Sequence, residues 1–278
     1  MSLLANVSLA GVKLLVGFFG NSFALVADGV ESLADIVSSA IVWTGFRVSD
    51  KDADHEHPYG HGKAEAIAAL LASVGLLVSA SFIAYHAIGE IGRSHEVPAL
   101  FTVPILLGII CIKEWLHFVL RRSGERMGSP ALKAEAWHHR SDSLTSMGVL
   151  LGICIAVFAG PGYEAADDIA ALLVTGLIVF NAVRIARPAL DELMDRRVDD
   201  FRIDAIEEVA RSIEGIECLE TIMVRRSGRQ FVAEIHMEVA PDMTIEKGHR
   251  LSHRLKDALL ADPELRLTHV VVHVEPAE

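Results

Sequence analysis

Long apolar stretches separated by short polar segments run through the first 190 residues of the chain. The pattern predicts six helices, each near the roughly 20 residues that are needed to cross a bilayer. They cover residues 3–20, 22–47, 64–90, 97–121, 133–159 and 166–187. Glycine and serine recur through these stretches, and small residues allow helices to pack closely in lipid. We therefore expect a six-helix transmembrane bundle over residues 1–190.

The pattern changes after Arg187-Pro188, where charged residues begin to occur every few positions. Residues 200–214 and 244–261 have the periodicity of amphipathic helices, whereas 220–226, 231–240 and 267–274 have the character of strands. The order α-β-β-α-β suggests a small antiparallel sheet with helices on one face, a ferredoxin-like α+β layer. We therefore expect a separate domain over residues 191–278.

Composition and charge exclude some classes of function. The chain is 51% hydrophobic and has a formal net charge of −12 at pH 7. Such an acidic chain lacks the basic face that nucleic-acid binding requires. The three cysteines are far apart in the sequence, which indicates neither a disulfide framework nor a thiolate metal site.

Basic residues are concentrated in alternate connections between the predicted spans. Residues 47–63, residues 121–133 and the segment after the last span are rich in Lys and Arg, whereas each intervening connection has at most one such residue. The positive-inside rule then places both termini in the cytoplasm. We expect a multi-pass protein of the inner (plasma) membrane, with the tail domain on its cytoplasmic side.

Two predicted spans carry ionisable side chains four residues apart, Glu31 with Asp35 and His138 with Asp142. An i,i+4 pair shares one helix face, and ionisable groups inside a membrane usually mark an ion pathway. Four such ligands suit tetrahedral zinc and would also take Fe(II), Co(II) or Mn(II). The alternative is that these groups hold helix ends together by hydrogen bonds. Asp28 falls off the face of the first pair, which favours a structural role or a role at the site entrance.

A second group of potential ligands lies in the connection after the second span. It contains Asp54, His57 and His61, and Pro58 and Gly60 impose a turn between the two histidines. This density of ligands favours a metal site that is open to water. The alternative is that the histidines only titrate.

The tail contains a third, scattered group. His273 and Glu275 point to the same face of a predicted strand, and His249 and His253 are about one helical turn apart. His236 lies in the neighbouring predicted strand. Each of these residues alone fits an ordinary surface position, but their number suggests a regulatory metal site.

Together, these motifs resemble those of the cation diffusion facilitators, six-span exchangers of divalent metals and protons. The resemblance covers nearly the whole chain, including the α+β tail. Its motifs are Asn6…Lys13…Gly17…Ser22-x-Ala24-Leu25-x-Ala27-Asp28-Gly29, Glu31-x-x-x-Asp35, His57-Pro-Tyr-Gly-His61-Gly-Lys63-Ala-Glu65 and His138-x-x-x-Asp142.

The resemblance implies three sets of metal ligands. The implied transport site consists of Glu31, Asp35, His138 and Asp142. The implied loop site consists of Asp54, His57 and His61. The tail domain dimerises and binds metal in relatives, so a homodimer is expected. The implied tail ligands are His236, His249, His273 and Glu275.

The expected function is efflux of a divalent metal from the cytoplasm by alternating access, in exchange for protons. His138 is the expected proton carrier because the unperturbed pKa of imidazole, about 6.5, lies near cellular pH. The His138-x-x-x-Asp142 half resembles zinc/iron-type members, so Zn²⁺ is the first expected substrate and Fe²⁺ the second. Members generally have Asp or His where this chain has Glu31, which leaves the metal preference open. No cofactor is expected. The metal itself is expected to serve as the substrate and as a regulatory ligand.

The sequence leaves three alternatives open. The first is an exporter of Mn²⁺, Co²⁺ or Cd²⁺ in the same family, and the second is a metal-gated channel or receptor without proton coupling. The third is a membrane metalloenzyme. The chain has no His-Glu-x-x-His motif and no candidate nucleophile beside a base, which argues against an enzyme.

Overall fold

A computed structural model describes residues 2–91, 97–126, 130–159, 163 and 165–277. Its first part is helical, as the apolar pattern predicts. The helices are α1 (Ser2–Phe19), α2 (Phe23–Ser49), α3 (Ala64–Glu90), α4 (Thr102–Arg126), α5 (Pro130–Phe158) and α6 (Ala165–Leu193). The tail contains α7 (Asp200–Arg211), β1 (Cys218–Ser227), β2 (Gln230–Val239), α8 (Ile245–Ala261) and β3 (Leu267–Pro276). The expected fold class, a helical membrane part followed by an α+β domain, is confirmed.

Four helices are long and apolar enough to cross a membrane: α3, α6, residues 102–123 of α4 and residues 136–158 of α5. The apolar part of α1, Asn6–Phe19, is shorter. Helix α2 is long enough but carries Asp28, Glu31 and Asp35 in its first half, which lowers its hydropathy. The polar residues that suggest a site are therefore the same ones that weaken the hydropathy signal of this helix.

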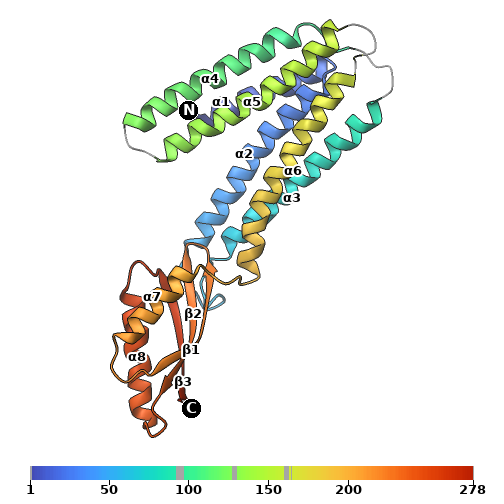
Figure 1. Ribbon diagram of the computed structural model, residues 1–278. Coiled ribbons are helices and arrows are strands. Elements are labelled where there is room, and N and C mark those ends of the chain that lie inside the picture. The colour runs from blue at the N-terminus through green and yellow to red at the C-terminus, as the bar shows by residue number, and fades with distance from the viewer. Residues whose placement is uncertain (1, 92–96, 127–129, 160–162, 164, 278) are drawn as a thin grey trace. The chain divides into compact units, whose positions relative to one another are not determined.

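The described chain divides into two compact units. One comprises residues 1–40 and 71–184, and the other comprises residues 41–70 and 185–278. Within the first unit, α4 and α5 lie side by side (Figure 1). Helices α5 and α6 approach closely at Gly152, where an added Cβ atom would lie 2.5 Å from the Cβ atom of Ala170. Glycine at this position therefore permits the close helix contact that small residues give in membrane proteins.

The tail sheet has the strand order β1-β2-β3, but its pairing differs from the expected one. Strands β1 and β2 pair antiparallel through a hairpin turn, whereas β2 and β3 pair parallel, with His236 opposite His273. The expectation of a fully antiparallel sheet was wrong. Helix α8 connects β2 to β3 and returns the chain to the starting end of the sheet, which makes the two strands parallel.

Helices α7 and α8 cover one face of this sheet (Figure 1). The apolar residues of β2 that face them, Ala233, Ile235, Met237 and Val239, are buried and alternate with polar ones. They pack against Leu251, Leu255 and Leu259 of α8 in one core. Because side chains alternate along a strand, His236 must point to the opposite, open face of the sheet. The core thus places the tail histidine on the face that no helix of the described chain covers.

Candidate functional site

One candidate metal site lies between α2 and α5 in the first unit. Asp35, His138 and Asp142 each offer one ligand atom, and these atoms lie within 4.8 Å of one another. His138 and Asp142 are one helical turn apart on α5, which brings His138 Nε2 to 3.7 Å from Asp142 Oδ2. The side chain of Asp142 is 18% exposed and that of His138 is 41% exposed. Two carboxylates and an imidazole in this arrangement can chelate a divalent cation without large backbone movement.

Glu31 does not join this group among the described residues. The residue is 8% exposed and lies one helical turn before Asp35 on α2. The structure therefore brings together three of the four predicted transport ligands. The role of Glu31 as a fourth ligand stays a prediction.

Two residues of α4 contact this region, and the sequence analysis did not single out either of them. Lys113 Nζ donates a hydrogen bond to Asp142 Oδ2 at 2.8 Å, and its side chain is only 3% exposed. Its neighbour Glu114 accepts hydrogen bonds from Ser143 and Arg140 of α5. Charged residues are rare within apolar spans and are usually paired there. The charges of Lys113 and Glu114 within an apolar stretch were therefore the sequence feature that could have identified these two residues.

Asp28 belongs to a different, buried network. Its Oδ1 atom lies 2.7 Å from Lys13 Nζ, and its Oδ2 atom accepts a hydrogen bond from Ser146 at 2.8 Å. The Lys13 ammonium also donates to Ser32 and Ser146. This network joins α1, α2 and α5, and Asp28 does not belong to the metal-ligand group. The geometry therefore favours a structural role for Asp28.

The loop ligands lie in the second unit and also form a group. The possible ligand atoms of Asp54, His57 and His61 lie within 4.8 Å of one another. Asp54 accepts hydrogen bonds from the backbone N–H groups of His57 and Glu56, and the His57 N–H is the main cause that lowers the pKa of the Asp54 carboxyl. Gly60 adopts φ of +80°, a conformation that suits glycine and returns the chain so that His61 approaches Asp54.

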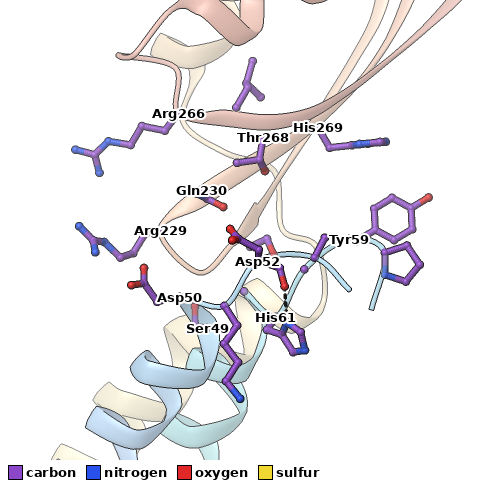
Figure 2. A pocket seen from close by; sticks show the side chains of 17 residues that line it. Ser49, Asp50, Asp52, Tyr59, His61, Arg229, Gln230, Arg266, Thr268 and His269 are labelled. Atoms are coloured by element: carbon purple, nitrogen blue, oxygen red, sulfur yellow. Dashed lines mark hydrogen bonds between the residues drawn. The ribbon is translucent and has the colours of Figure 1, made fainter. Parts of the chain in front are cut away.

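A cavity of about 600 Å³ adjoins this loop group, and His61 lines it (Figure 2). Figure 2 shows Arg229 and Arg266 on one side of the cavity and Tyr59 and His269 on the other. The ring centroids of Tyr59 and His269 are 5.3 Å apart, so the loop contacts the start of β3. The loop site is thus built against the tail sheet.

An ion-pair cluster anchors the same loop. Lys63 Nζ lies 2.9 Å from Asp195 Oδ1, and Arg225 lies 3.1 Å from Asp195 Oδ2. Burial alone would raise the pKa of Asp195, but the hydrogen bonds and charges of Lys63 and Arg225 together lower it. Asp195 therefore stays ionised and connects the loop after α2 to strand β1.

A third group lies on the open face of the tail sheet. It consists of Glu220, His236 and Glu275, whose ligand atoms lie within 4.8 Å of one another. His273 is adjacent, with Nε2 3.2 Å from Glu275 Oε1. Glu220 was not predicted from the sequence, because its approach to Glu275 depends on the pairing of β1, β2 and β3. The hydrogen bond and the charge of Glu275 raise the pKa of Glu220, as expected for two carboxyl groups that compete for one proton or cation.

His249 does not join the tail group among the described residues. It lies on α8, which packs on the other face of the sheet, and its ring centroid is 4.6 Å from that of His253. Within one chain, the structure therefore brings together His236, His273 and Glu275 but not His249. Its role as a ligand stays a prediction.

Comparison with known proteins identifies the family. Residues 1–194 match the cation efflux transmembrane domain, and residues 198–277 match the cytoplasmic domain of cation efflux proteins. The chain belongs to the cation efflux family. The two matches meet close to the end of α6, between Leu193 and the start of the tail.

Cation efflux relatives resemble the chain over almost all of its length. "Metal tolerance protein C1" of Arabidopsis thaliana is 29% identical over 100% of this chain, which spans 61% of that relative. "Metal tolerance protein 2" of Oryza sativa is 30% identical over 99% of this chain and 76% of its own length. "Manganese efflux system protein MneP" of Bacillus subtilis is 29% identical over 99% of this chain and 94% of its own length. Membership of this family supports a membrane protein that transports metal cations.

Proposed function

We propose that the protein exports a divalent first-row transition metal from the cytoplasm in exchange for protons. Zn²⁺ is the first candidate substrate and Fe²⁺ the second. The observation that carries the proposal is the convergence of Asp35, His138 and Asp142, from two helices, to within 4.8 Å inside the helical unit. Carboxylate and imidazole groups must be deprotonated to bind a metal, so metal and protons compete for the same atoms.

Proton exchange follows from this competition. When the site faces the side with less free metal and more protons, the ligands take up protons and release the cation. His138 is suited to carry a proton because the ring nitrogen of an imidazole binds either a proton or a metal ion. Alternating access would expose the site first to one side of the membrane and then to the other.

Manganese is a second candidate substrate, and two observations favour it. Two relatives from Bacillus subtilis, each 29% identical to this chain, are named manganese efflux system proteins. The site is also rich in oxygen, with two carboxylates in the group and Glu31 buried one turn away. Carboxylate ligands suit Mn²⁺, whereas imidazole suits zinc and iron.

We further propose that the loop and tail groups bind regulatory metal. The loop group is Asp54, His57 and His61, and the tail group contains His236 and Glu275. The tail domain would join two copies of the chain into a homodimer, with both termini in the cytoplasm. This part of the proposal rests on the family resemblance and on the excess of basic residues in the expected cytoplasmic connections.

Transport by the purified protein in proteoliposomes tests the proposal. Uptake of Zn²⁺, Fe²⁺, Mn²⁺, Co²⁺ and Cd²⁺ is measured together with proton movement, reported by a pH-sensitive dye. We expect metal uptake with opposite proton flow in the wild type, its loss in Asp35→Asn, and normal transport in the control Glu246→Gln, a solvent-exposed carboxylate on α8. Metal flux without proton flow would refute the exchange mechanism, and normal transport by Asp35→Asn would refute the site. Comparison with Glu31→Asp tests whether the longer side chain sets the metal preference.

A further inference from the structure

Lys113 occupies a part of the site that a transported metal would need. Its ammonium lies 2.8 Å from Asp142 Oδ2, and the same oxygen lies 3.7 Å from His138 Nε2. A metal ion held by His138 and Asp142 would lie where these two side chains face each other. The ammonium and the metal are therefore two cations that compete for one carboxylate.

The negative charges of Asp35 and Asp142 require a compensating cation when no metal is bound. With Asp35 and Asp142 ionised, the ligand group carries two negative charges in a part of the protein where uncompensated charge is costly. A divalent cation balances both charges. When the site holds no metal, Lys113 balances the charge of Asp142, and the protons that exchange for the metal are left to the other ligands. Lys113 thus supplies a counter-charge in the state that must return across the membrane without metal.

The two buried lysines of the helical unit differ in how firmly they are held. Lys13 contacts Asp28, Ser32 and Ser146, so all three of its N–H donors have a partner. For Lys113, Asp142 is the single hydrogen-bond partner among the residues that the structure describes. A lysine ammonium on a flexible four-carbon stem with one partner can leave that partner without breaking a wider network. Lys113 is therefore placed to move and Lys13 to stay.

We propose that Lys113 is a tethered competitor for the transport site. It binds Asp142 when the site holds no metal and releases this carboxylate when metal binds. This inference rests on the proposed function, in which Asp35, His138 and Asp142 hold the transported metal. Lys113 weakens metal binding, and it speeds the return of the empty site by neutralising part of its charge.

Two consequences separate this role from a merely structural one. Removing the ammonium should tighten metal binding by about tenfold to a hundredfold, the effect of deleting one competing charge-assisted hydrogen bond. It should also slow net transport, which requires the empty site to return, while leaving the exchange of labelled for unlabelled metal intact. A structural defect would weaken binding and slow both processes together.

The experiment compares Lys113→Met with Lys113→Arg and with Glu114→Gln, all in the full-length protein. Methionine keeps the apolar stem without the charge, and arginine keeps the charge. Glu114→Gln is the matched control, because it disrupts another polar contact between α4 and α5, with Arg140 and Ser143, without touching a ligand. Binding of Zn²⁺ and Mn²⁺ is measured by calorimetry in detergent, and net transport and metal exchange are measured in proteoliposomes. Lys113→Gln replaces the methionine variant if the latter does not fold.

We expect tighter binding, slower net transport and retained exchange in Lys113→Met, with values near those of the wild type in Glu114→Gln. Lys113→Arg keeps the charge, so its metal binding should be no tighter than that of the wild type. The tightening should disappear when Asp35→Asn is added, which assigns it to the transport site and not to the loop or tail groups. Unchanged or weaker binding in Lys113→Met, or equal loss of net transport and exchange, would overturn the inference. If Asp35→Asn alone leaves transport intact, the proposed transport site itself fails, and this outcome is distinct from a failure of the role of Lys113.

Discussion

The buried pair of Lys13 and Asp28 gives a quantitative prediction about how the helical unit is held together. The side chains are 0% and 3% exposed, and the Lys13 Nζ and Asp28 Oδ1 atoms are 2.7 Å apart. Removing one partner leaves the other charge buried without its counter-charge, which typically destabilises a protein by about 3–5 kcal/mol. We therefore expect Lys13→Met and Asp28→Asn each to lower stability strongly.

The size of the effect on thermal melting can be estimated from the length of the domain. The transmembrane domain matches residues 1–194, and domains of about 150–250 residues shift in Tm by about 2–4 °C per kcal/mol. Each single variant should then melt about 6–20 °C below the wild type. The double variant should recover most of this loss, because neither unpaired charge remains.

Thermal melting of the purified protein in a neutral detergent is the assay, with metal binding as a second readout. A double variant that melts as low as the worse single variant would show that the two charges do not stabilise each other. A second refuting result is an Asp28→Asn variant that keeps its melting temperature but loses metal binding at the transport site. That outcome would make Asp28 a ligand rather than a structural partner of Lys13.

Two further predictions concern the groups outside the helical unit. Hydrogen bonds lower the pKa of Asp54 in the folded protein. The stability that the ionised Asp54 gives to the loop is therefore fully present above the pKa of an unfolded aspartate. It is lost only as the pH falls through the lower pKa of the folded state. Hydrogen exchange at the His57 and Glu56 amides should therefore stay slow in mild acid, and loss of protection between pH 6 and 5 would contradict this. Asp54→Ala, which removes the acceptor oxygen, should expose both amides at every pH. For the tail, Glu220→Gln should weaken calorimetric metal binding by about tenfold, as expected for loss of an orienting or ligating carboxylate, and unchanged binding would exclude Glu220 from the site.

The sequence predicts the elements of this protein better than their contacts. The lengths of the apolar stretches predict where the membrane helices lie, and the more frequent charged residues after Arg187-Pro188 predict where the tail begins. The parallel pairing of β3 was missed because it depends on the path of the chain through α8, which strand periodicity does not encode. The attachment of residues 41–70 to the tail, in the same compact unit, likewise depends on contacts such as that of Lys63 with Asp195.

The same difference between elements and contacts holds for the candidate sites. His138 and Asp142 are neighbours on one helix, so their spacing alone predicts their proximity. Lys113 and Glu220 approach their partners from distant parts of the sequence, and only the packing of α4 on α5 and the pairing of the strands reveal them. The sequence therefore identifies ligands that share an element, whereas Lys113 and Glu220, which reach these groups from other elements, become visible only in the folded chain.

The proposed transport requires a metal ion to bind between α2 and α5. Anomalous diffraction from metal-loaded crystals of the full-length protein tests it most directly, with data collected at the absorption edges of zinc and manganese. We predict an anomalous peak about 2.0–2.2 Å from a carboxylate oxygen of Asp35, from a carboxylate oxygen of Asp142 and from a ring nitrogen of His138, with the Lys113 ammonium moved off Asp142. An empty position between α2 and α5, with Lys113 still bound to Asp142 while the loop and tail groups hold metal, would show that Asp35, His138 and Asp142 are not the transport site.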